Sequence, residues 1–173
     1  RAPPAAVSPP GERPDIDGGD RAGDPAGPET PPPVRIVLDT NVLVSGLLSP
    51  YGPSADILRM VSSGDPVLCF DARILTEYRE VLRRPRFGFE ESRVEALLEQ
   101  VVGRGTRVAP PPWPRTLPDP DDAPFLEAAK AGEAECLVTG NLAHFPKAAC
   151  LGVRVLSPAK FIATLGSAPK PGR

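Results

Sequence analysis

The chain has 173 residues, of which 40% are hydrophobic and 24% charged, and this is the size and composition of one globular domain. Its formal net charge of -2 at pH 7 neither demands nor excludes a nucleic-acid partner. The sequence contains no apolar run of about 18 residues, which excludes a membrane-spanning helix, and its three widely spaced cysteines without a Cys-x-x-Cys pair favour reduced thiols in a cytoplasmic protein.

Residues 1–33 differ in composition from the rest of the chain. They contain ten prolines and five glycines, and Val7 and Ile16 are their only aliphatic side chains larger than alanine. Such a segment buries too little apolar surface to offset its ordering entropy. We therefore expect disordered tails at residues 1–33 and 167–173 and a folded domain at residues 34–166. One hypothesis is that the first tail is an upstream extension of a protein that naturally starts near Val34.

Buried strands and amphipathic helices alternate through the predicted domain. Strands are expected at residues 35–39, 67–70, 106–109, 135–139 and 153–156, and helices at 42–48, from 54, at 72–83, at 89–102, from 122 and at 158–165. The expected N-caps are Ser54, Asp71, Asp121 or Asp122, and Ser157. The proline-rich residues 110–120 are expected to cross the surface as a loop. This alternation predicts an α/β fold, in which helices cover both faces of a central, mostly parallel sheet.

Three acids are placed where the fold would bring them to one end of that sheet. Asp39 follows the first strand, Glu77 lies at the edge of the apolar stripe of a helix, and Asp122 opens another helix. Asp39 alone could equally cap the turn that follows it, and Glu77 alone could be a solvated helix residue. Carboxylates that converge repel one another, so a shared Mg²⁺ or Mn²⁺ ion is the expected cofactor. Such a site favours phosphodiester hydrolysis.

Four segments in this order resemble the PIN-domain family. They are Ile36-Val37-Leu38-Asp39-Thr40-Asn41, Leu75-Thr76-Glu77-Tyr78, Asp119-Pro120-Asp121-Asp122 with Phe125-Leu126, and Leu137-Val138-Thr139-Gly140-Asn141. The resemblance covers about residues 34 to 165, including a final Ser-Pro helix. It implies a three-layer α/β/α sandwich and a metal-dependent endoribonuclease, often the toxin of a VapBC-type toxin–antitoxin pair.

The resemblance also implies a role for each matching residue. Asp39, Glu77 and Asp122 correspond to the family's metal-binding and catalytic acids, and Asn141 would assist them in catalysis. Asn41 and Thr139 resemble the polar residues that orient the site. The implied partners are an RNA substrate and an antitoxin protein, with residues 51–63 as a candidate antitoxin or homodimer surface.

Asn141 departs from the family pattern, which frequently has aspartate at this place. An amide offers a neutral oxygen, which would hold a second metal ion more weakly than a carboxylate. This departure motivates an alternative function, a catalytically impaired PIN-like module that binds RNA or protein. A third interpretation, a haloacid-dehalogenase-like phosphatase, needs an aspartate where this chain has Asn41.

Other polar residues have weaker functional signals. Asp119 and Asp121 are expected to be turn and solubility residues, and a structural or solvent-facing role is favoured for His144 over contact with phosphate. Arg79, Arg83, Arg84 and Arg86 could follow an RNA backbone, and a solvated helix end is an equally good explanation for them.

Overall fold

A computed structural model describes residue 27 and residues 30–167. The predicted disorder of residues 1–33 and 167–173 concerns segments that lie almost entirely outside this range. In the described part, no helix is long and apolar enough to cross a membrane.

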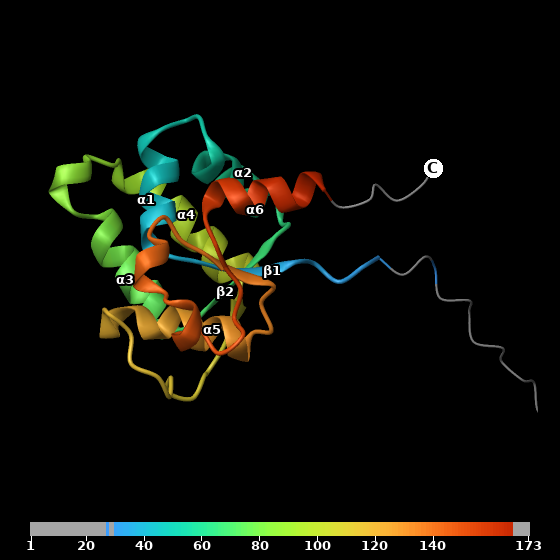
Figure 1. Cartoon of the computed structure of the whole chain (residues 1–173). Coiled ribbons are helices and arrows are strands. Elements are labelled where there is room, and N and C mark those ends of the chain that lie inside the picture. The colour runs from blue at the N-terminus through green and yellow to red at the C-terminus, as the bar shows by residue number, and fades with distance from the viewer. Residues whose placement is uncertain (1–26, 28–29, 168–173) are drawn as a thin grey trace, which may run out of the picture. The chain divides into compact units, whose positions relative to one another are not determined.

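The core of the described domain is a parallel sheet of five strands (Figure 1). Its spatial order is β3-β2-β1-β4-β5, and every pairing is parallel. The predicted strands all occur, several of them shorter than expected. Their bounds are β1 Arg35–Leu38, β2 Val67–Phe70, β3 Thr106–Arg107, β4 Cys136–Val138 and β5 Val155–Leu156.

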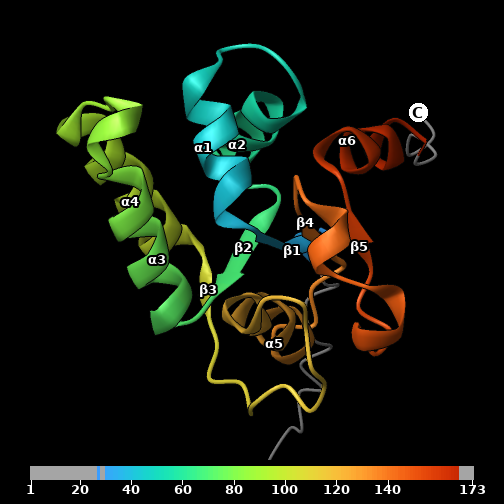
Figure 2. The ribbon, with the colours of Figure 1, turned by 60° about the vertical axis from the view of Figure 1, so that its left-hand side comes forward.

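Six α-helices cover the sheet and confirm the predicted α/β/α architecture. Helix α5 packs against β1, β2 and β4 on one face, and α1, α2 and α6 lie on the other side of the sheet (Figure 2). The helices are α1 Thr40–Leu48, α2 Pro53–Ser63, α3 Ala72–Leu82, α4 Glu91–Arg104, α5 Ala123–Ala131 and α6 Pro158–Gly166.

Burial explains why β1 and β4 occupy the centre. Ile36, Val37 and Leu38 of β1 are fully buried, and so are Leu137 and Val138 of β4. Strands covered on both faces read as continuous apolar runs, which is how the sequence signals them. The chain runs from β1 outward to β2 and β3 and then returns to β4 on the opposite flank, so the strand order reverses between β1 and β4. Ligands bind beside the carboxyl ends of strands at such a switch point.

Two of the expected N-caps are confirmed by their hydrogen bonds. The Asp71 carboxylate accepts the N–H of Ile74, and the Ser157 hydroxyl accepts the N–H of Lys160. The Ser54 cap is wrong, because α2 starts one residue earlier, at Pro53, with Gly52 as a cap that makes no side-chain bond. Proline has no N–H to satisfy and its ring already holds a helical φ, so Pro53 can begin the helix without a side-chain cap.

The proline-rich loop before α5 is held at several points. The backbone N–H of Trp113 donates to Glu127, its indole N–H donates to the carbonyl of Ala149, and the Leu117 side chain is buried. Cys69, Cys136 and Cys150 are buried free thiols, as predicted.

Candidate active site

Asp39 and Thr139 lie side by side at the carboxyl ends of the two central strands. The register pairs Leu38 with Val138, and the N–H of Asp39 continues the ladder by donating to the Val138 carbonyl at 2.9 Å. The Thr139 hydroxyl donates to Asp39 Oδ2 at 2.8 Å, across 100 positions of sequence. Asp39 is only 7% exposed, so this bond keeps a nearly buried carboxylate in one orientation.

Asn41 fixes the same carboxylate from the start of α1. Its backbone N–H makes the N-cap bond to Asp39, and its Nδ2 donates to Asp39 Oδ2 at 3.3 Å. Its Oδ1 accepts the N–H of Gly140 at 3.0 Å, which ties α1 to the loop after β4. The structure thus places both predicted orienting residues, Asn41 and Thr139, in direct contact with Asp39.

Glu77 approaches from α3 and is also held by a residue of α1. The Thr40 hydroxyl donates to Glu77 Oε1 at 2.8 Å. The next residue, Tyr78, is fully buried, and its hydroxyl donates to the Leu38 carbonyl at 2.5 Å, directly before Asp39. Two adjacent residues of α3 are therefore bonded to the residues on either side of Asp39, Leu38 of β1 and Thr40 of α1, and this sets the place of Glu77 relative to Asp39.

Asp122 occupies the N-cap position of α5, and its side chain is used elsewhere. It makes no side-chain cap bond, and Oδ2 instead lies 2.9 Å from Nδ1 of His144, a residue of the short helix η3 (Leu142–His144). Asp122 is therefore the N-cap residue, as expected, but its carboxylate makes no cap bond because His144 takes it. The alternative cap, Asp121, lies inside the preceding turn η2 (Pro120–Asp122), which Asp119 caps through the N–H of Asp121.

Asn141, the fourth predicted catalytic residue, reaches the site through its backbone. Its N–H donates to the Thr139 hydroxyl at 3.0 Å, and its side chain is half-buried. The Thr139 hydroxyl thus accepts from Asn141 while it donates to Asp39, and this chain of bonds links the β4 loop to the acid.

The predicted acids interact through their charges. Burial raises the pKa of Asp39, and the hydrogen bond from Thr139 opposes this rise. Burial also raises the pKa of Glu77, to which the charges of Asp39 and Asp122 add, while the Thr40 hydrogen bond acts in the opposite direction. The pKa of Asp122 rises to about 6 through burial and the Asp39 charge, despite the bond to His144. The charge of Asp39 therefore disfavours ionisation of both Glu77 and Asp122.

A cleft of about 850 Å³ opens beside these acids, between α3 and the start of α5. Glu77 and Asp122 lie in its wall, and most of the other polar side chains there are also acidic. Its lining consists of Ala72, Arg73, Thr76, Glu77, Glu80, Val81, Arg84, Asp119, Pro120, Asp121, Asp122, Ala123, Pro124 and Glu127.

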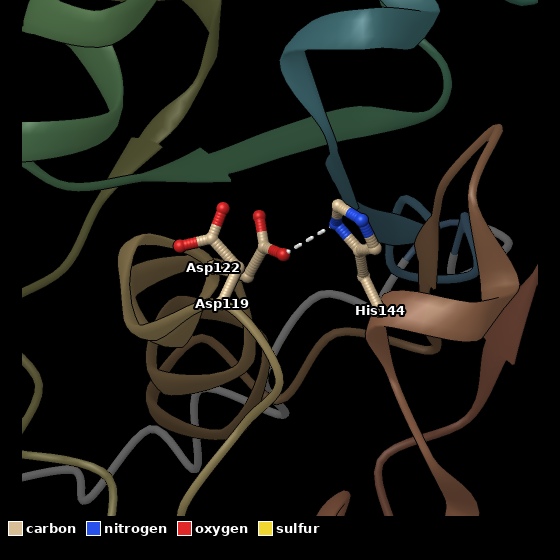
Figure 3. A group of neighbouring side chains, drawn as sticks. All are labelled: Asp119, Asp122 and His144. Carbon is tan, nitrogen blue, oxygen red and sulfur yellow. Dashed lines mark hydrogen bonds and ion pairs between the residues drawn. The ribbon is translucent and has the colours of Figure 1, made fainter.

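The donor set of this region fits a divalent cation. One ligand atom each from Asp119, Asp122 and His144 lies within 4.8 Å of the other two, and Figure 3 shows the imidazole facing the two carboxylates. Carboxylate oxygens suit Mg²⁺ and Mn²⁺, and an imidazole is a better ligand for transition metals than for Mg²⁺. A cation here would also offset the burial and the neighbouring Asp39 charge that raise the pKa of Asp122.

The sequence pattern of the PIN domain matches residues 35–143, which is most of the described chain. The chain belongs to the PIN-domain family. PIN domains are generally metal-dependent nucleases, and an acidic cleft next to a group of side chains that could hold a cation agrees with a nuclease-type fold.

A solved structure supports the fold. The protein PAE2754 from Pyrobaculum aerophilum is 16% identical to this chain, with a TM-score of 0.50, and the likeness covers 78% of this chain and 90% of that one. At this identity the likeness concerns the fold alone. No curated protein matches the chain significantly.

Sequence reasoning missed the contributions of His144 and Asp119 to this PIN domain. His144 is 42% exposed and faces Asp122 rather than solvent alone, and Asp119 caps a turn while lying within reach of the same possible ion. The one signal in the sequence was the position of His144, three residues after Asn141 in the segment that follows the central strand β4.

Proposed function

We propose that this PIN domain is a metal-dependent endoribonuclease that hydrolyses phosphodiester bonds in RNA. The observation that carries the proposal is a set of interacting acids, in which the charge of Asp39 raises the pKa values of Glu77 and Asp122. Beside them, the ligand atoms of Asp119, Asp122 and His144 lie within 4.8 Å of one another. Among the described residues, none of the three forms an ion pair with a lysine or arginine. Interacting acids that have no lysine or arginine partner are expected to use a cation from solution.

Asp39, Glu77 and Asp122 would hold Mg²⁺ or Mn²⁺, with Asp119 and His144 beside Asp122. When bound, such an ion polarises a phosphoryl oxygen, lowers the pKa of water and stabilises charge on the leaving oxygen. The chain's own residues set the geometry beforehand, because Thr139 and Asn41 hold the Asp39 carboxylate and Thr40 holds Glu77.

Two further residues have a role in the proposed reaction. Glu77 binds metal or orients the attacking water, and Asn141 assists with a neutral amide. The reaction adds water across one P–O bond, so the hydroxyl joins phosphorus and the proton goes to the leaving sugar oxygen.

A cleavage assay on the purified chain tests this function. A labelled single-stranded RNA is incubated with Mn²⁺, with Mg²⁺ or with EDTA, and its fragments are resolved. We expect cleavage that needs the ion and falls by at least about 100-fold in Asp39→Asn, because a metal-binding acid is lost. Asp71→Asn is a matched control, since Asp71 is also a buried aspartate that caps a helix.

Binding of RNA without cleavage by the wild-type chain would favour the alternative module, for which Asn141 is the motivating residue. Failure of both binding and cleavage in the presence of either ion would contradict the nuclease function and RNA binding by the alternative module.

We further propose that the nuclease is the toxin of a toxin–antitoxin pair and that its antitoxin covers exposed apolar residues near α2. Tyr51 is 83% exposed and Leu48 is 58% exposed at the connection between α1 and α2.

Expression of the chain alone should arrest growth, while Asp39→Asn should not. Rescue by a small protein co-expressed from a neighbouring reading frame would support the assignment, and its loss in Tyr51→Ser would support this surface. Unimpaired growth at full expression of an active nuclease would contradict it.

A further inference from the structure

The acidic cleft presents an electrostatic problem for an RNA substrate. Six of its lining residues are carboxylates, whereas Arg73 and Arg84 are its two basic residues; the acids are Glu77, Glu80, Asp119, Asp121, Asp122 and Glu127. A phosphate backbone approaching this wall is repelled except where a cation meets it. A fixed cation in the wall would therefore decide where the strand lies.

Arg73 is already committed to other residues. Its Nε and Nη2 donate to Asp71 Oδ2 at 2.8 and 2.5 Å, and Nη2 also pairs with Glu127. Both of these carboxylates are buried. Turning Arg73 toward a phosphate would leave them without their counter-charge, which is costly.

Arg84 differs from Arg73 and from the neighbouring arginines. Arg83 pairs with Glu91 and Glu95, and the Arg86 guanidinium lies 4.7 Å from the centre of the Phe87 ring. Among the described residues, Arg84 forms no ion pair. Unlike Arg83 and Arg86, it also lines the cleft.

The backbone of Arg84 is held in place at the end of α3. Its N–H donates to the Val81 carbonyl at 3.1 Å, and it adopts an extended conformation directly before Pro85. Arg84 follows the last residue of α3, Leu82, by two positions, and both Arg84 and Glu77 line the cleft. The guanidinium is thus available on the same wall as Glu77.

We propose that Arg84 binds a backbone phosphate of single-stranded RNA in the cleft and so positions the scissile phosphodiester against the acids. This assignment rests on the proposed ribonuclease function. A guanidinium binds phosphate through two parallel hydrogen bonds, which fixes the strand as well as attracting it. Arg84 is a positioning residue, because it contacts the substrate away from the reacting bond.

Glu80 provides the competing explanation for Arg84. It lies one turn earlier on the same wall, so Arg84 could serve as its partner at positions i and i+4. The two explanations predict opposite effects of Glu80→Gln. Removal of the acid should strengthen RNA binding if Arg84 meets phosphate, and should mimic Arg84→Ala if Arg84 acts only through Glu80.

Fluorescence anisotropy tests the assignment with a labelled single-stranded RNA of about 12 nucleotides. The full chain carries Asp39→Asn and Mg²⁺ is present, so the RNA stays intact. Arg84→Ala should raise Kd about 5- to 10-fold and reduce the slope of log K against log salt by about 0.7, because one phosphate contact is lost. Arg84→Lys should retain the slope. The matched controls Arg79→Ala and Arg86→Ala should change Kd by less than about twofold.

Kinetics of the otherwise wild-type enzyme provide a second measurement. Arg84→Ala should raise KM with kcat kept within about twofold, because binding of substrate and transition state is weakened equally. Equal effects of Arg84→Ala and Arg86→Ala, or weaker RNA binding in Glu80→Gln, would overturn the assignment and leave the nuclease function intact. A wild-type chain that neither binds nor cuts RNA would overturn both.

Discussion

Buried or half-buried carboxylates occur at two neighbouring places in this domain, and their charges are balanced in different ways. In the first, Asp71 and Glu127 share Arg73, and Glu127 also accepts the N–H of Trp113 at 2.8 Å. This internally paired cluster joins α3, α5 and the proline-rich loop.

The second place holds Asp39 with Glu77 and Asp122. Hydroxyl and amide groups hold Asp39 and Glu77, while Asp122 contacts His144. Hydrogen bonds orient a charge without neutralising it, and burial raises the pKa of all three acids, to which repulsion between carboxylates adds for Glu77 and Asp122. The comparison teaches that an arginine of the chain neutralises the structural carboxylates. Within the described part of the chain, the acids of the candidate site have no such arginine, and a metal ion from solution is expected there.

The largest effect should follow removal of the internal cation. Arg73→Met keeps an unbranched side chain over α5 and leaves Asp71 and Glu127 uncompensated. We expect a loss of about 2 to 3 kcal/mol in the free energy of unfolding, below the cost of breaking a fully buried pair, because Arg73 is 52% exposed. Urea denaturation measures this loss.

A double variant sharpens this first prediction. Adding Glu127→Gln to Arg73→Met removes one of the two unpaired charges, so part of the lost stability should return. Equal stability of the single and double variants would show that the ion pairs contribute little.

Addition of Mn²⁺ should have the next largest effect on the stability of the fold. Mn²⁺ at ten times its dissociation constant should stabilise the wild-type fold by about 1.4 kcal/mol, since the ion binds only the folded chain. The thermal midpoint should rise accordingly, and the rise should disappear in Asp39→Asn. The matched variant Asp71→Asn should keep the rise, because it leaves the acidic site intact. An equal response of Asp39→Asn to Mn²⁺ would place the ion elsewhere.

The third prediction concerns pH in the absence of metal. A carboxyl whose pKa is raised on folding holds its proton more tightly in the folded state, so its contribution to stability falls as pH rises from about 4 to 6. Asp122→Asn should therefore be more stable than wild type by about 1 kcal/mol at pH 7.5. The gain is kept below the full value of the shift because the cleft is open to water.

The gain should vanish near pH 4, where Asp122 is protonated in the wild-type chain too. Thermal midpoints measured in EDTA across this pH range give the result. A variant that is less stable than wild type at pH 7.5 would show that the bond to His144 outweighs the repulsion.

The alternation of strands and helices could be predicted from the sequence because its signals are local. Buried strands such as β1 form continuous apolar runs, and Asp71 and Ser157 make cap bonds to residues three positions away. Asp39 is conspicuous for the same reason, since it stands directly after such a run.

The Ser54 cap was wrong, and the Asp122 cap makes no side-chain bond, because in each case a competing interaction was invisible in the local pattern. Pro53 begins α2 by its own geometry, and the Asp122 carboxylate turns to His144, 22 positions away. The pairing of Arg73 with Glu127 spans 54 positions and likewise depends on how α5 packs against α3. The sequence could name the acids of the site, and only the fold could show which charges are left without a partner.

The smallest effect should come from removing a hydrogen bond that orients one acid while the charge of that acid is kept. Thr40→Val keeps the shape of the buried side chain and removes the hydroxyl that donates to Glu77 Oε1. The ionised form of Glu77 loses a hydrogen bond, so Mn²⁺ should bind about threefold more weakly at pH 7. Titration of free Mn²⁺ by electron paramagnetic resonance measures this affinity. Thr76→Val is a matched control in the cleft wall, because its hydroxyl donates to the Ala72 carbonyl and not to an acid. Equal affinities in the two variants would mean that Thr40 affects folding alone, whereas a loss confined to Thr40→Val would show that orientation of Glu77 contributes to metal binding.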